Sequence, residues 1–114
     1  MFDIMTLFCI LGGKQRMKFD NFTRVEGDSC GTIQLFGLST CIWCKKTKEY
    51  LNSKGIEYYY VFVDLLNESE KEEAKKLIKK WNNDISYPTI IINESRSVIG
   101  FDEDEIDREI ARNE

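Results

Sequence analysis

Residues 32–54 read TIQLFGLSTCIWCKKTKEYLNSK, and this segment carries the strongest structural signals of the chain. Its first five residues, Thr32–Phe36, are rich in β-branched and aromatic side chains and predict a short strand. Its second half predicts a helix over 42–54, because apolar side chains recur on one helical face and Gly55 provides a stop. Between the strand and the helix lies the motif Cys41-Ile42-Trp43-Cys44.

The motif places two sulfurs at a strand-to-helix turn. The first sulfur lies near the N–H groups of a helix N-terminus, whose partial positive charge favours thiolate over thiol. Thr40 offers a hydroxyl that can cap this helix. Cys44 follows Cys41 by one helical turn, which places it to close a disulfide onto Cys41. A Cys-x-x-Cys motif beside a βαβ pattern therefore indicates a thiol–disulfide exchange site.

The chain after this helix alternates between β-prone and helical patterns. A near-continuous β-prone run precedes an amphipathic run, and two short β-prone runs around a turn precede a last helix that Asp102 can cap. Because a βαβ crossover is right-handed and joins parallel strands, we predict an α/β protein of the order β-α-β-α-β-β-α, with a four-stranded mixed sheet and helices on both faces. The predicted elements are strand 57–63, helix 69–81, a hairpin of 89–92 and 96–99, and helix 102–111.

The length of 114 residues allows one domain with a buried core. Residues 1–29 end in a turn-like segment and predict an N-terminal extension, whereas 30–114 predict the folded domain. The apolar run 4–11 is too short to span a bilayer, and we expect a strand or a loosely docked segment there, with a weak signal or membrane-surface segment as the alternative. Met17 would also serve as a start, and the sequence leaves this open.

The amino-acid composition argues against several kinds of partner and catalytic site. The net charge of −4, and the glutamates between the lysines of 71–80, argue against a nucleic-acid partner, because phosphate binding needs clustered cations. Histidine is absent, which removes Cys-His and Ser-His catalytic pairs and zinc sites that need imidazole. Catalysis must then use cysteine, carboxylate or main-chain groups.

The number of cysteines, four, indicates the cellular compartment. They are too few for a disulfide-stapled secreted scaffold, so we expect a reducing, cytoplasmic location without stable membrane association. Cys30, about ten residues before Cys41, is interpreted as a buried or edge thiol, and Cys9 likewise. Oligomeric state is not encoded in any motif, and we expect a monomer.

Three motifs between Thr32 and Ile110 resemble motifs of one protein family, and they occur in the same relative positions along the chain. These are Ser39–Lys45 around the cysteines, Ser86–Ile90 around the single proline of the chain, and Val98–Asp102 before the last helix. They are similar to the redox loop, the segment before the third strand and the entry to the final helix of glutaredoxins, which have the thioredoxin fold. The resemblance implies a cis proline beside the sulfurs, and a lone proline opening a buried strand fits that place independently.

The resemblance also implies a mechanism. Cys41 would attack a substrate disulfide, helped by Lys45 and the helix amides, and Cys44 would resolve the mixed disulfide. The reaction needs no metal or cofactor; the partners are disulfide-containing proteins and an electron donor, either glutathione or a reductase. The residues implied to bind substrate are Thr40, Trp43, Lys45, Tyr87, Pro88, Gly100, Phe101 and Asp102.

Several positions differ from the pattern common in glutathione-using glutaredoxins. Leu38 replaces a basic residue, Tyr87 replaces a small β-branched one, and Phe101 replaces the second glycine of a pair. Ile42-Trp43 also replaces the usual Pro-Tyr between the cysteines. Each change removes or crowds a contact to glutathione. The related redoxins that serve ribonucleotide reductase, which accept electrons from thioredoxin reductase, are the alternative within this fold.

Two other function classes stay open. Four cysteines can ligate a metal or an iron–sulfur cluster, which would make the protein a binding module of glutaredoxin fold. The irregular spacing of Cys9 and Cys30 argues against such a site within one chain. An adaptor without redox chemistry is the third class, and it predicts that Cys41→Ser leaves the biological activity intact.

Overall fold

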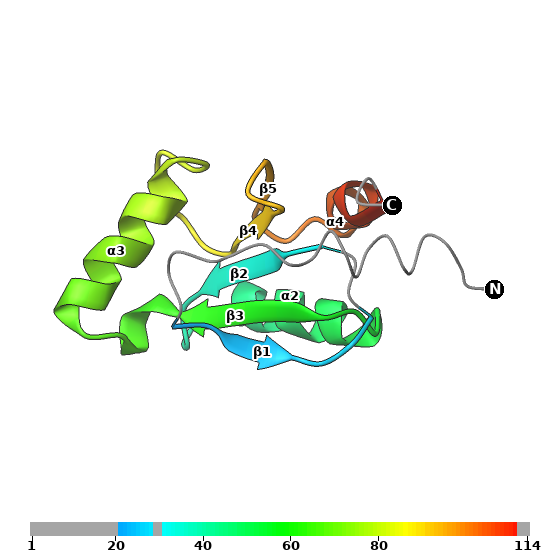
Figure 1. The fold of residues 1–114 in the computed structure, drawn as a ribbon, viewed down its shortest axis with the longest axis horizontal. Coiled ribbons are helices and arrows are strands. Elements are labelled where there is room, and N and C mark those ends of the chain that lie inside the picture. The colour runs from blue at the N-terminus through cyan, green and yellow to red at the C-terminus, as the bar shows by residue number, and fades with distance from the viewer. Residues whose placement is uncertain (1–20, 29–30, 112–114) are drawn as a thin grey trace.

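The computed structural model describes residues 21–28 and 31–111 of the chain. Within them the strands form one mixed sheet, flanked by α-helices (Figure 1). The elements are β1 (Thr23–Val25), β2 (Ile33–Gly37), α2 (Ile42–Ser53), β3 (Tyr58–Phe62), the 3-10 helix η1 (Val63–Leu65), α3 (Glu68–Lys79), β4 (Thr89–Ile92), β5 (Arg96–Ile99) and α4 (Glu103–Ala111). The predicted α/β class and its order of elements from Thr32 are confirmed.

The sheet has the strand order β1-β3-β2-β4-β5. Strands β2 and β3 run parallel, with Leu35 opposite Tyr60, as the predicted crossover requires. Strand β4 pairs antiparallel with both β2 and β5, so the predicted hairpin is present. All five residues of β2 are buried, because neighbouring strands and both layers of helices enclose it.

The sheet contains five strands, one more than predicted. Strand β1 pairs antiparallel with β3, with Thr23 opposite Tyr60, and it lies in the segment that the sequence assigned to the extension. A three-residue strand is too short to show alternation, so its position is fixed by tertiary contacts instead. Arg24 forms an ion pair with Glu57, and the Phe22 ring meets Phe36 edge-on at 5.3 Å. Residues 1–20, and with them Cys9, lie outside the described residues, as does Cys30.

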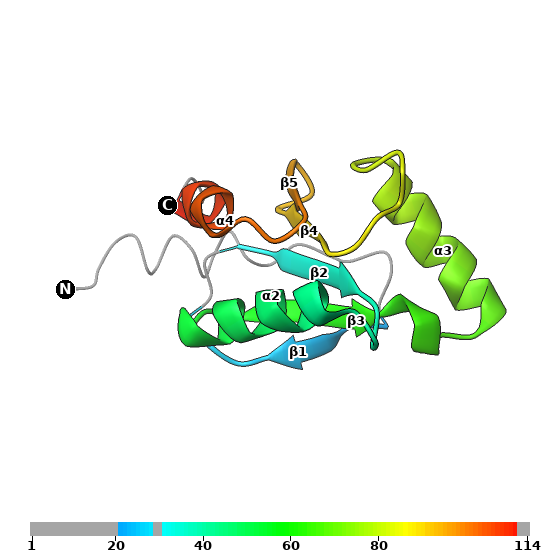
Figure 2. The same cartoon turned by 180° about the vertical axis from the view of Figure 1, so that it is seen from behind.

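Helices cover both faces of the sheet, as predicted. Leu51 of α2 and Ile106 of α4 are buried in one cluster with apolar residues of β2, β4 and β5. Ala74 and Ile78 of α3 are buried in a second cluster on the other face. Figure 2 shows the face that α2 covers, and the end of the sheet where α2 begins is the end that carries the cysteines.

Candidate redox site

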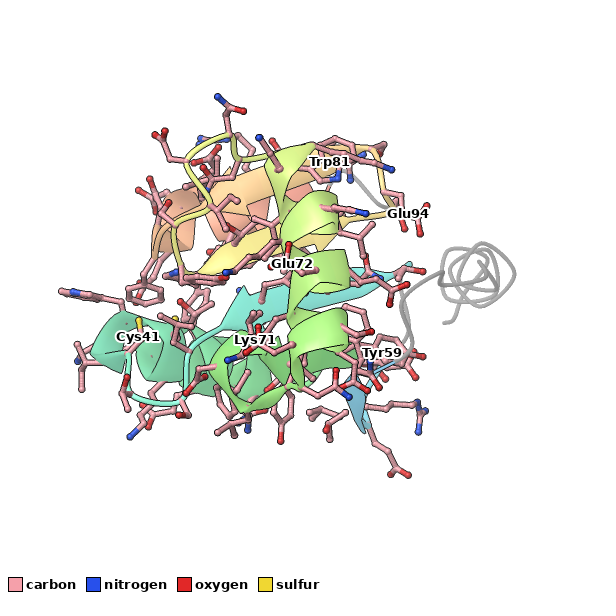
Figure 3. The ribbon with its side chains drawn as sticks, turned by 90° about the vertical axis from the view of Figure 1, so that its left-hand side faces the viewer. Cys41, Tyr59, Lys71, Glu72, Trp81 and Glu94 are labelled. Carbon is pink, nitrogen blue, oxygen red and sulfur yellow. The ribbon has the colours of Figure 1, made fainter. Side chains whose placement is uncertain are left out.

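Cys41 is the N-cap residue of α2, at the exit of the central strand (Figure 3). Its main chain is extended, with φ −90° and ψ 120°, and its Sγ accepts a hydrogen bond from the N–H of Cys44 at 3.2 Å. The sulfur therefore takes the capping role that the sequence assigned to the hydroxyl of Thr40, which is exposed. That assignment was wrong by one residue because a cysteine side chain can accept this bond as well.

The second sulfur is in a different environment. Cys44 is only 1% exposed, whereas Cys41 is half-buried, and both are free thiols. Burial, followed by its hydrogen bond with Cys41, raises the pKa of Cys44 to about 12. The end of β2 passes close by: a Cβ on Gly37 would lie 3.0 Å from the Cβ of Cys44. One thiol thus faces solvent while its partner stays protonated behind it.

The loop before Cys41 is held by a carboxylate that sequence reasoning missed. Ser39 donates its main-chain N–H to Asp64 Oδ1 at 2.8 Å and its hydroxyl to Oδ2 at 2.6 Å. These bonds from Ser39 lower the pKa of Asp64. Strands β2 and β3 are parallel, so their carboxyl ends meet at one edge of the sheet. A polar residue shortly after β3 is the signal of this contact in the sequence.

The third segment at the site is the loop before β4. The Tyr87–Pro88 peptide is cis, as the resemblance implied, and Pro88 is buried. The carbonyl of Pro88 accepts the N–H of Gly100 at 2.8 Å, which joins this loop to the end of β5. Burial raises the pKa of Tyr87, and electrostatic interactions with Cys44 and Asp64 raise it further. The phenol therefore lies within electrostatic range of the buried cysteine.

An open cavity of about 280 Å³ borders these segments. The ring of Trp43 lies 6.1 Å from that of Phe101 at 28°, and the Trp43 side chain, 54% exposed, forms part of the wall. Trp43 is therefore a surface residue of the site and not part of the core. The lining consists of five residues that the resemblance implied to bind substrate: Trp43, Tyr87, Pro88, Gly100 and Phe101.

The other three residues implied to bind substrate are not in that lining. Thr40 and Lys45 are exposed near the start of α2. Asp102 caps α4 as predicted, since its Oδ1 accepts the N–H of Glu105 at 3.1 Å. Their direct contact with a substrate remains a prediction.

Two further properties concern the described part of the chain only. Within residues 21–28 and 31–111, no group of three or more cysteine, aspartate or glutamate side chains is arranged to hold a metal ion. Likewise, none of the helices described there is long and apolar enough to cross a membrane.

A central β-α turn with Cys-x-x-Cys at the helix N-terminus, facing a cis-proline loop, defines a protein of the thioredoxin fold. Comparison with known proteins then identifies the family. The glutaredoxin family model matches residues 33–96, and the chain belongs to the glutaredoxin family. An uncharacterised glutaredoxin-like protein in a rubredoxin operon of Clostridium pasteurianum is 37% identical over 81 residues, covering 70% of this chain and 99% of the relative.

Solved structures agree with that assignment. The crystal structure of a glutaredoxin from Methanosarcina mazei Go1 superposes with a TM-score of 0.76 at 40% identity, covering 89% of this chain and 93% of that one. Methanoredoxin from Methanosarcina acetivorans gives a TM-score of 0.74 at 44% identity, covering 82% and 97%. The resemblance inferred from three motifs is thereby confirmed at the level of family and fold.

Proposed function

We propose that the protein is a thiol–disulfide oxidoreductase that reduces protein disulfides, or mixed disulfides with glutathione, through Cys41 and Cys44. The observation that carries this proposal is the asymmetry of the two sulfurs. Cys41 is accessible at a helix N-terminus, and Cys44 is 1% exposed with a pKa raised to about 12. An accessible sulfur at a helix N-terminus suits attack, and a protonated neighbour suits the later, resolving step.

The cycle balances in two displacements. The thiolate of Cys41 attacks one sulfur of the substrate disulfide, forming a mixed disulfide and releasing the other substrate sulfur as a thiol after it gains a proton. Cys44 then loses its proton, and its sulfur attacks Cys41, forming the Cys41–Cys44 disulfide and releasing the second substrate thiol. The substrate gains two electrons, and the protein loses two.

The surroundings of the sulfurs favour an extended polypeptide as substrate. The lining of the cavity includes the aromatic rings of Trp43, Tyr87 and Phe101, which suit an apolar side chain next to the reacting cysteine. Among the described residues, the main-chain N–H and C=O of Tyr87 have no hydrogen-bond partner. We infer that they pair with the main chain of the substrate, in the manner of an added strand.

The electron donor is the second part of the proposal. Leu38 supplies no charge for a carboxylate of glutathione, and Phe101 adds bulk where a glycine would leave room, which favours a reductase as donor. Either donor fits a reducing, cytoplasmic compartment. The cycle itself requires no cofactor.

The test is a turnover assay with an insulin disulfide and a glutathione mixed disulfide as substrates, with dithiothreitol or glutathione as donor. We expect reduction with dithiothreitol, and loss of more than about 100-fold in Cys41→Ser, because its alcohol cannot replace a thiolate nucleophile. Weak activity with glutathione alone would support an enzyme reductase as donor. Full activity of Cys41→Ser would refute the proposal.

A further inference from the structure

The loop that carries Tyr87 is organised around one buried amide. Asn82 is 5% exposed and lies just after α3. Its Nδ2 donates to the carbonyl of Ser86 at 3.2 Å, to the Ser86 hydroxyl at 2.8 Å and to Thr89 Oγ1 at 3.1 Å. Its Oδ1 accepts the N–H of Asp84 at 3.2 Å. Both ends of the amide are therefore used inside one loop.

The main chain of the same residue closes the loop from the other side. The N–H of Asn82 donates to the carbonyl of Ile78 at 2.8 Å, and its own carbonyl accepts the N–H of Ile85 at 2.9 Å. The hydroxyl of Thr89 donates to the carbonyl of Ser86 at 2.7 Å. The segment from α3 to the first residue of β4 is thus fixed by hydrogen bonds that converge on Asn82.

This loop holds a conformation that its own sequence does not favour. Ile85 has φ +50°, in the left-handed region that a β-branched residue rarely enters. Such a conformation persists only when surrounding contacts dictate it, and it is common next to functional sites. The contacts here are the bond to Asn82 and the packing of Ile85 against the apolar cluster beneath α3.

The residues that Asn82 holds stand on either side of the cis peptide. Ser86 precedes Tyr87, and Thr89 follows Pro88. The main-chain groups of Tyr87 take no part in the network, so its peptide is fixed in place while its own N–H and C=O stay available. A network that fixes the residues on both sides of Tyr87, while its own main chain stays available, suits a positioning role.

We propose that Asn82 is a positioning residue that presents the main chain of Tyr87 to extended polypeptide substrates, and so favours them over small disulfides. The proposal rests on the proposed disulfide reductase function. A small disulfide has no peptide groups with which to pair, so it gains nothing from a well-placed Tyr87. An extended chain gains main-chain hydrogen bonds that depend on the position of that residue.

Two probes with the same leaving group separate these cases. One is a ten-residue peptide whose single cysteine forms a mixed disulfide with 2-mercaptoethanol; the other is bis(2-hydroxyethyl) disulfide. Reduced protein is mixed with each probe in a stopped-flow instrument, and oxidation is followed by the fluorescence of Trp43, in a background in which Cys9 and Cys30 are replaced by serine. The readout is the ratio of the two second-order rate constants.

In Asn82→Ala we expect this ratio to fall roughly tenfold, as expected for losing one or two well-formed hydrogen bonds in the transition state. The rate with the small disulfide should stay within about twofold. Asn83→Ala, at the exposed neighbour, is the matched control and should leave both rates unchanged. Equal falls with both probes, or no fall in a folded variant, would overturn the proposal.

A variant that fails to fold does not end the test. Thr89→Val keeps the shape of a buried side chain and removes only the hydroxyl that connects Asn82 to Ser86. It should lower the ratio in the same direction by a smaller factor, and an unchanged ratio would count against the proposal. If wild-type protein reduces neither probe, the disulfide reductase function itself is refuted, which is a distinct outcome from an unchanged ratio.

Discussion

Two loops flank the cysteines, and they are held by opposite means. The loop before Cys41 is tied to Asp64, an exposed carboxylate that accepts two bonds from Ser39. The loop before Pro88 is tied to Asn82, a buried neutral amide. An exposed charge is screened by water and loses its effect when protonated, whereas a buried amide is insensitive to pH and costly to remove.

The largest expected loss of stability is at the buried amide. Asn82→Ala removes a buried side chain that forms hydrogen bonds with Ser86, Thr89 and Asp84 and so holds the loop together. We expect a loss of about 2–3 kcal/mol in the free energy of unfolding, measured by urea denaturation. Asn83→Ala should change it by less than about 0.5 kcal/mol. Similar values for the two variants would contradict the contrast between the loops.

Next in size is the position where the central strand ends at the site. Gly37→Ala places a Cβ 3.0 Å from the Cβ of Cys44 and 3.2 Å from its sulfur. We expect a loss of about 1–2 kcal/mol in urea denaturation, and slower closure of the Cys41–Cys44 disulfide, because Cys44 must shift. Thr40→Ala, on the exposed loop, is the control. A Gly37→Ala protein with unchanged stability and closure rate would show that the contact is not restrictive.

A pH effect should distinguish the reduced from the oxidised protein. The pKa of Cys44 in the folded state, about 12, lies above the usual value of 9.0, so the folded protein keeps a proton that the unfolded chain releases. Stability of the reduced protein should therefore fall as pH rises from about 9 toward 12. The oxidised protein lacks the contribution of Cys44 to this pH dependence. Both forms share the contribution of Tyr58, whose pKa is also raised to about 12 by burial. Identical alkaline profiles for the two forms would contradict the burial of Cys44 as a thiol.

The smallest effect is expected at the exposed carboxylate. Asp64→Asn should lower the free energy of unfolding by no more than about 1 kcal/mol at neutral pH, since exposed charged contacts contribute little. The folded-state pKa of Asp64 is lowered, so its contribution is present above the unfolded value and lost as pH falls through the folded one. The difference between wild type and Asp64→Asn should thus shrink between pH 5 and pH 3. Ser39→Ala should show a similar trend. A stability difference between wild type and Asp64→Asn that grows on acidification would have the opposite sign and would contradict this prediction.

The parts of the molecule that the sequence predicts well are those with local signals. The helices α2 and α3 show apolar periodicity, and the two cysteines and the single proline identify the site. Strand β1 was missed, because three residues have no measurable pattern and their pairing with β3 depends on the tertiary structure. Asp64 and Asn82 were missed as well, since their partners are brought to them by the fold, Ser39 lying 25 residues away from Asp64.

The different roles of Cys41 and Cys44 are tested most directly by a trapping experiment. In a background with Cys9 and Cys30 replaced by serine, Cys44→Ser and Cys41→Ser are each exposed to the peptide mixed disulfide at neutral pH, and the products are mapped by mass spectrometry. We predict a stable mixed disulfide at Cys41 in the first variant, and at least about 100-fold slower modification of Cys44 in the second, because that thiol is buried and protonated. Equal modification of the two cysteines, or faster modification of Cys44, would contradict the assignment of attacking and resolving sulfurs.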